Sequence, residues 1–129
     1  VWEMTFGSLP ENLPAIATRK VKWDRRYQQK YGITTAAAEG LPEGTQARLE
    51  KLSRRIYRAL HLTGYARMDF RLRADGALYV LEANANPNLA AEEDLAQSAE
   101  KAGMSYDDLL HRIMLLGAHY PAAWRMLDG

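Results

Sequence analysis

Two carboxylates and an amide stand close together in the middle of this chain, in a segment whose pattern predicts two strands. Asp69 lies in a stretch, 65–72, that alternates apolar and polar residues, and Glu82 and Asn84 lie in a second stretch beyond a short turn. Carboxylate and amide oxygens are hard ligands that suit Mg²⁺ or Mn²⁺. The chemistry available to this set is therefore the binding of a divalent cation, if the fold brings the three residues together.

The turn between the two predicted strands decides whether these three residues come together. Asp75-Gly76 is typical of a two-residue type I′ hairpin turn, because both residues tolerate the positive φ that this turn requires. The cross-strand pairs expected from such a turn are Asp69 with Glu82, Arg67 with Asn84, Phe70 with Leu81 and Met68 with Ala83. Two carboxylates about 5 Å apart repel by roughly 3 kcal/mol at an effective dielectric near 20. A hairpin that keeps this pair therefore indicates a cation between the two acids.

Two other interpretations of the hairpin stay open. Its polar face is also compatible with a solvated surface on which Asp69 pairs with Arg67 or Arg71 and Glu82 is simply exposed. A three-residue loop would also shift every pairing by one residue and separate the carboxylates. The next segment, 84–89, collects amides and a proline, which favours a loop that holds a ligand.

The composition sets the class of protein. With 129 residues, 47% of them hydrophobic, the chain is one domain or part of one, and a net charge of +1 gives no field for nucleic acid or an anionic membrane. The absence of cysteine excludes disulfides and thiolate metal sites. We expect a cytoplasmic protein with no nucleic-acid or membrane partner, and a homodimer is one of the oligomeric states that the sequence allows. Because Val1 opens a segment that reads as a strand already under way, we interpret residues 1–129 as a fragment of a longer chain.

The periodicity predicts an α+β fold in which helices pack on one face of an antiparallel sheet. We expect a strand over 1–6, irregular structure over 33–44, and a helix that Thr45 caps and that runs to about Leu62. Two more helices are expected, one over about 92–101 that stops at Gly103 and one that begins after Ser105 and ends near Pro121.

A basic run precedes the first long helix. Its members are Arg19, Lys20, Lys22, Arg25, Arg26 and Lys30, with Trp23, Tyr27 and Tyr31 between them. Such a run is typical of a solvated face, but it also suits a phosphate clamp or a nucleic-acid surface, and the low net charge disfavours the last. The three histidines lie far apart, and no serine stands in a nucleophile-elbow sequence, so neither residue type indicates a catalytic site.

The hairpin carries the pattern of a known family. Arg67-x-Asp69, then Glu82-x-Asn84 and a proline-containing loop, resembles the end of the ATP-grasp ligases, and among them the D-alanine–D-alanine ligases. The segment 102–106 between the last two helices, and the pair Lys30-Tyr31, are also similar to that family. The similarity spans about 30–117, and residues 1–29 match only loosely.

This resemblance implies that residues 1–129 form the C-terminal subdomain of an ATP-grasp fold. It implies an enzyme that uses ATP to join a carboxylate to an amine through an acyl phosphate, releasing ADP and phosphate. One or two Mg²⁺ ions would be bound by Asp69, Glu82 and Asn84. Arg67 would stabilise the oxyanion of the tetrahedral intermediate. Lys30 would contact an ATP phosphate, and Tyr31 would position a loop on the substrate side. The fragment alone is expected to be inactive.

The loop after the metal strand departs from the family pattern. D-alanine ligases usually carry Ser-Pro-Gly-Met-Thr there, followed by a serine that binds the carboxylate of the second substrate. This chain has Asn-Pro-Asn-Leu-Ala-Ala at 86–91, followed by the acidic residues Glu92, Glu93 and Asp94. The acidic residues either favour the start of a helix through its dipole or receive a cationic amine substrate. D-alanine as the second substrate is therefore not implied.

Two other classes of function remain as alternatives. A glycosidase would use Asp69 and Glu82 as an acid/base pair without metal or nucleotide, but the hairpin offers mainly Tyr65 and Tyr79 for stacking on a sugar. A non-catalytic module would keep the ATP-grasp fold for regulation or scaffolding. The three oxygen ligands argue against such a module, because a non-catalytic protein does not need a complete set of metal ligands.

Overall fold

A computed structural model describes residues 1–120 of the chain, and Pro121, which was expected to end the last helix, lies outside them. The chain divides into two compact units, residues 1–39 and residues from 40 onward. Each unit is described by itself. The expectation that the whole chain forms one subdomain stays a prediction.

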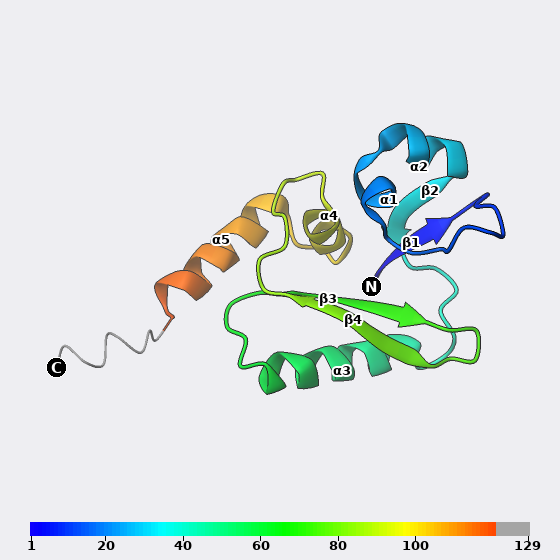
Figure 1. Cartoon of the computed structure of the whole chain (residues 1–129). Helices are drawn as coiled ribbons and strands as arrows, with labels where there is room; N and C mark the ends of the chain where they lie inside the picture. The colour runs from blue at the N-terminus through cyan, green and yellow to red at the C-terminus, as the bar shows by residue number, and fades with distance from the viewer. Residues whose placement is uncertain (121–129) are drawn as a thin grey trace. The chain divides into compact units, whose positions relative to one another are not determined.

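The first unit is a pair of antiparallel strands with two short helices in the connection between them (Figure 1). Strand β1 (Trp2–Phe6) pairs with β2 (Ile33–Ala37) without interruption, from Trp2 opposite Ala37 to Phe6 opposite Ile33. The helices are α1 (Arg19–Trp23) and α2 (Arg25–Tyr31). Val21 and Ile33 form the buried apolar centre of this unit.

Strand β2 corrects the expectation of irregular structure over 33–44. Its sequence, with small residues after Ile33, carries a weak strand signal, and its partner lies near the start of the chain rather than beside it. Gly32, in the left-handed region at φ 60°, ends α2 and turns the chain into β2. The Gly7 N–H donates to the Gly32 carbonyl at 3.1 Å, which continues the pairing beyond the ladder.

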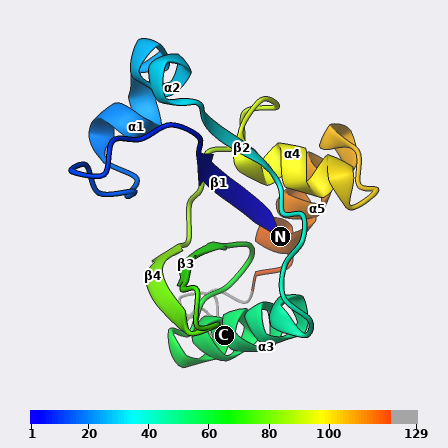
Figure 2. The same ribbon diagram turned by 90° about the vertical axis from the view of Figure 1, so that its right-hand side faces the viewer.

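The second unit contains a hairpin and three helices. Helix α3 (Thr45–Ala59) lies along the hairpin of β3 (Arg67–Leu72) and β4 (Leu78–Asn84), as Figures 1 and 2 show, and it contacts β4. Gly44, not Thr45, occupies the N-cap of α3; Thr45 is instead its first residue and is buried. The helix ends at Ala59, three residues before the expected end. The α+β class with antiparallel strand pairs is as the sequence predicts.

Helices α4 (Asp94–Lys101) and α5 (Tyr106–Ala118) follow the hairpin. The expected cap of α5 is confirmed: Ser105 Oγ accepts from the Asp108 N–H at 3.2 Å and donates to the Asp108 carboxylate at 2.6 Å. Gly103, at φ 87°, follows α4 as predicted. Within residues 1–120, no helix has the length and apolar character that crossing a membrane requires.

Candidate active site

The turn of the hairpin is not the two-residue turn that the sequence predicts. The Arg73 N–H donates to the Ala77 carbonyl and the Gly76 N–H donates to the Arg73 carbonyl, both at 2.9 Å, so the loop holds the residues 74–76. Gly76 supplies the left-handed conformation, at φ 81°, that closes such a loop. Next to the turn, the pairing is therefore one residue away from the predicted register. Phe70 lies opposite Val80, and the expected pairing with Leu81 was wrong.

A second irregularity cancels this shift. The register changes between Asp69 and Phe70, which leaves Leu81 as an extra residue in β4. Beyond this bulge, Asp69 lies opposite Glu82 and Arg67 lies opposite Asn84. These central pairings are those predicted from the sequence, although the turn that was expected to produce them does not form. The loop and the bulge together bring the two carboxylates face to face.

Arg67 forms a bidentate ion pair with Asp69. Its Nε donates to Asp69 Oδ1 at 2.7 Å, and a terminal nitrogen donates to Oδ2 at 3.0 Å. This is the partner that the solvated-surface interpretation named, yet both side chains are only about 30% exposed. The hydrogen bond to Asp69 raises the pKa of Arg67, against the opposing effect of burial, and the charges of Asp69, Asp94 and Glu82 raise it further. The guanidinium is therefore a permanent cation at this site.

The remaining oxygen donors belong to Glu82 and Asn84. Glu82 is exposed, and Asn84 is half-buried, where its Oδ1 accepts from the Asn86 N–H at 2.9 Å. This bond forms a small turn at the start of the loop. Asn88 repeats the arrangement, since its Oδ1 accepts from the Ala90 N–H at 3.1 Å. The amides of the loop thus order its own backbone, and Pro87 is buried within it.

The donor chemistry of this face fits a hard divalent cation. In residues 1–120 no group of three Asp, Glu or His side chains is arranged to hold a metal ion, and the predicted set has two carboxylates, Asp69 and Glu82, and the amide of Asn84. A carboxylate accepts at about four lone-pair positions, and Arg67 uses two of those of Asp69. Asp69 therefore keeps acceptor capacity for a cation, which would share this carboxylate with Arg67.

Lys30 and Tyr31 belong to the first unit, at the end of α2. The Lys30 ammonium lies 4.9 Å from the centre of the Tyr31 ring, and the ring of Tyr27 packs at 4.6 Å from that of Tyr31. The structure thus brings Lys30 and Tyr31 together in one unit, and Arg67, Asp69, Glu82 and Asn84 together in the other.

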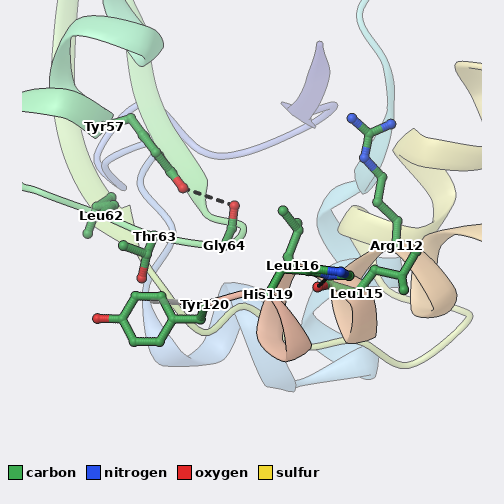
Figure 3. A pocket seen from close by; sticks show the side chains of 9 residues that line it. All are labelled: Tyr57, Leu62, Thr63, Gly64, Arg112, Leu115, Leu116, His119 and Tyr120. Carbon is green, nitrogen blue, oxygen red and sulfur yellow. Dashed lines mark hydrogen bonds between the residues drawn. The ribbon is translucent and has the colours of Figure 1, made fainter. Parts of the chain in front are cut away.

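A separate hollow of about 620 Å³ lies in the second unit. Its lining, drawn in Figure 3, consists of Tyr57, Leu62, Thr63, Gly64, Arg112, Leu115, Leu116, His119 and Tyr120. The Tyr57 hydroxyl donates to the Gly64 carbonyl at 2.9 Å across one side of it. None of the predicted site residues contributes to this lining, so the hollow is distinct from the hairpin face.

Residues 12–115 match the family described as D-ala D-ala ligase C-terminus. The chain belongs to this family. Named relatives include a D-alanine–D-alanine ligase of Desulfovibrio desulfuricans, 35% identical over 120 residues, and one of Oleidesulfovibrio alaskensis, 39% identical over 124 residues. Each of these alignments covers 89% of this chain and 39% of the relative. The chain thus spans about two fifths of the length of these ligases.

A solved structure agrees with the family assignment. The crystal structure of a D-alanine–D-alanine ligase from Bacillus anthracis, complexed with ATP, matches 75% of this chain and 31% of its own, with a TM-score of 0.63 and 32% identity. The fold of the chain is therefore that of the C-terminal part of an ATP-grasp ligase, as the sequence predicts. The glycosidase alternative receives no support from these relatives.

Sequence reasoning singled out Asp94 only within an acidic run and did not connect it with Arg67. The charge of Asp94, the first residue of α4, is one of the causes that raise the pKa of the Arg67 guanidinium. The sequence placed it in an acidic run at the start of a helix. The only signal was the charge itself, because nothing in the local pattern links α4 to β3.

Proposed function

We propose that this chain, a member of the family described as D-ala D-ala ligase C-terminus, is part of an ATP-dependent carboxylate–amine ligase. In that reaction ATP phosphorylates a carboxylate, an amine displaces the phosphate, and ADP and phosphate leave. The observation that carries the proposal is the register of the hairpin, which sets Asp69 opposite Glu82 and Arg67 opposite Asn84. The ATP complex of the Bacillus anthracis ligase supports ATP as the nucleotide.

Asp69, Glu82 and Asn84 are the residues proposed to hold one or two Mg²⁺ or Mn²⁺ ions. When bound, such an ion neutralises charge on the ATP phosphates during phosphoryl transfer. The facing pair of carboxylates supports this role, because a cation removes the repulsion that the register otherwise imposes. Asn84, the last residue of β4, adds a neutral amide oxygen on the same face.

Arg67 is the proposed catalytic residue. Its charge is permanent and its orientation is fixed by the two bonds to Asp69, so it is prepared to stabilise an oxyanion without reorganising. Lys30 is proposed to contact an ATP phosphate, and Tyr31 to position a loop on the substrate side. The 4.9 Å contact between the Lys30 ammonium and the Tyr31 ring supports the role of Lys30, since the ring restrains the lysine while leaving its hydrogens free to donate.

The amine substrate is proposed to be small, and its identity is left to experiment. The loop 84–91 lacks the serine and threonine that the resemblance leads one to expect, and its amides bond its own backbone. We further propose that the protein acts in the cytoplasm on small molecules.

A second function has one observation in its favour. Both oxygens of Asp69 are bound by Arg67, as they would be in a regulatory module that keeps the fold without binding metal. The two functions make opposite predictions for Glu82, which is exposed and takes no part in the ion pair.

The test is ADP release by the full-length protein across a panel of amino acids, dipeptides and cationic amines, with Glu82→Gln as the decisive variant. A ligase loses turnover by about 10²-fold or more, because the isosteric amide removes the negative charge and one of the two oxygen donors of Glu82. Glu100→Gln, at an exposed position on α4, is the matched control and should keep full turnover. Full activity in Glu82→Gln, or no ADP release with any substrate pair, would contradict the proposal and favour the regulatory module.

A further inference from the structure

The loop 85–93, which joins β4 to α4, is anchored by side chains of the two helices that follow it. Tyr106, the first residue of α5, donates from its hydroxyl to the Leu89 carbonyl at 3.0 Å. Gln97, on α4, donates from Nε2 to the Ala91 carbonyl at 3.1 Å. Because α4 and α5 also contact each other, the two bonds hold the end of the loop against a packed pair of helices.

The position of Tyr106 is fixed by the start of α5. Ser105 caps this helix and bonds both the N–H and the carboxylate of Asp108. Because Tyr106 comes directly after the cap, its backbone belongs to the first turn of the helix. Its hydroxyl then reaches a carbonyl 17 residues earlier in the chain, so this bond fixes the loop relative to the helix and not the helix itself.

The other end of the loop begins at the proposed metal site. Asn84 ends β4 opposite Arg67, and its Oδ1 accepts from the Asn86 N–H at 2.9 Å. The Tyr65 hydroxyl donates to Asn86 Oδ1 at 3.4 Å. The loop is thus tied to the hairpin at its start and to the two helices at its end. The acyl phosphate of the proposed reaction forms beside the metal site, so the loop that starts there is placed to contact the attacking amine.

We propose that Tyr106 and Gln97 are positioning residues, which hold the loop 85–93 in place as a preformed wall of the amine site. This inference rests on the proposed function. A loop that is already ordered loses less conformational entropy when a substrate binds than a loop that must first become ordered. The two side chains therefore favour binding of the amine through the loop, and they do not affect binding of ATP.

The experiment compares Tyr106→Phe with Tyr57→Phe in the full-length protein. Each substitution removes a tyrosine hydroxyl that donates to a backbone carbonyl of the second unit, at 3.0 Å to Leu89 and at 2.9 Å to Gly64. ADP release is measured against the concentration of ATP and of each amino acid or amine in the panel above that supports turnover. Tyr106→Phe should raise the KM for the amine by about 3- to 10-fold, the size expected from one neutral hydrogen bond, and leave the KM for ATP unchanged. Tyr57→Phe should change neither KM, because Gly64 lies outside the loop.

A second pair of variants tests the other anchor of the loop. Gln97→Met removes the bond to the Ala91 carbonyl and keeps a side chain of similar length, so it should also raise the KM for the amine alone. Gln46→Met is the matched control, because it removes a glutamine bond to Glu50 within α3, and it should change neither KM.

A further readout needs no substrate. Hydrogen exchange of a peptide that spans 85–93, measured by mass spectrometry, should be about 2- to 10-fold faster in Tyr106→Phe and in Gln97→Met and unchanged in Tyr57→Phe. A purely structural role of Tyr106 would lower the melting temperatures of Tyr106→Phe and Tyr57→Phe alike and change neither the exchange of the loop nor the KM for the amine. That result, a change in only one of these two readouts, or an equal rise in both KM values overturns the inference while leaving the ligase proposal intact. Absence of ADP release with any substrate pair overturns the ligase proposal and, with it, the role of the loop in binding the amine.

Discussion

The two strand pairs, β1–β2 and β3–β4, differ in the regularity of their register. In β1–β2 every residue lies opposite its partner from Trp2–Ala37 to Phe6–Ile33, without a bulge. In β3–β4 the pairing starts from a three-residue loop and then changes register at Asp69, where Leu81 is left over. The regular pair places no two acids opposite each other. The irregular pair does, and it carries all four residues of the proposed metal and oxyanion site.

The comparison shows that the facing acids depend on two compensating features. The loop alone would have moved Glu82 away from Asp69, and the bulge alone would have done the same in the other direction. Bulges commonly re-aim side chains near active sites, and this one lies directly beside the acid that Arg67 holds. We infer that the bulge is part of the site rather than a defect of the hairpin.

The largest effect should come from the core of the regular pair. Ile33→Ala removes one of the two buried apolar side chains described in the first unit, with an expected cost of about 2–5 kcal/mol. Because the unit has so little other apolar burial, we expect β1 and β2 to lose their hydrogen-exchange protection. Exchange measured by mass spectrometry on peptides from both strand pairs checks this.

The control is Leu49→Ala in α3, which removes a comparable buried side chain from the second unit. It should reduce protection of β3 and β4 and spare β1 and β2. If either substitution lowers protection in both strand pairs equally, the units do not behave as separate compact bodies and the comparison fails.

A smaller effect is expected at the turn of the irregular pair. Gly76→Ala should destabilise the chain by about 1–2 kcal/mol, because alanine is strained at φ 81° although space is open there. Gly117→Ala is the matched control: it adds the same methyl group into open space, within α5 and without a positive φ, and should stabilise by up to about 1 kcal/mol. Urea denaturation of both variants measures the difference, and equal effects would show that the turn conformation is not what constrains residue 76.

Local chemistry allowed much of this architecture to be predicted from the sequence. The strand at the start of the chain, the stripe of α3, and the cap of α5 by Ser105 each depend on residues within a few positions of one another. The facing of Asp69 and Glu82 was also predicted, but from a two-residue turn that does not form. The prediction held because the bulge at Leu81 corrects the register, and no residue in the sequence marks that bulge.

Features that depend on distant partners were not predictable. Strand β2 has a weak pattern of its own and forms because β1, far earlier in the chain, offers it a ladder. The contribution of the Asp94 charge to the pKa of Arg67 likewise depends on the fold, because no local pattern relates α4 to β3. In the sequence, Asp94 belongs to an acidic run that either starts a helix or receives a cationic amine. The roles of Lys30, Tyr31, Arg67, Asp69, Glu82 and Asn84 remain predictions, and the Glu82→Gln variant tests the one assigned to Glu82.

The smallest effect should come from a side-chain hydrogen bond across the regular pair. The hydroxyls of Thr5 and Thr34 lie 2.9 Å apart on the exposed face of β1–β2. Thr34→Val keeps the branched shape that suits a strand and removes this bond, so we expect a loss of no more than about 0.5–1 kcal/mol. Thr35→Val, at an exposed neighbouring position without such a cross-strand bond in residues 1–120, is the matched control. Thermal denaturation should separate the two variants only slightly; a loss in Thr34→Val as large as that in Ile33→Ala would mean that surface hydrogen bonding, and not buried Ile33, holds the regular pair together.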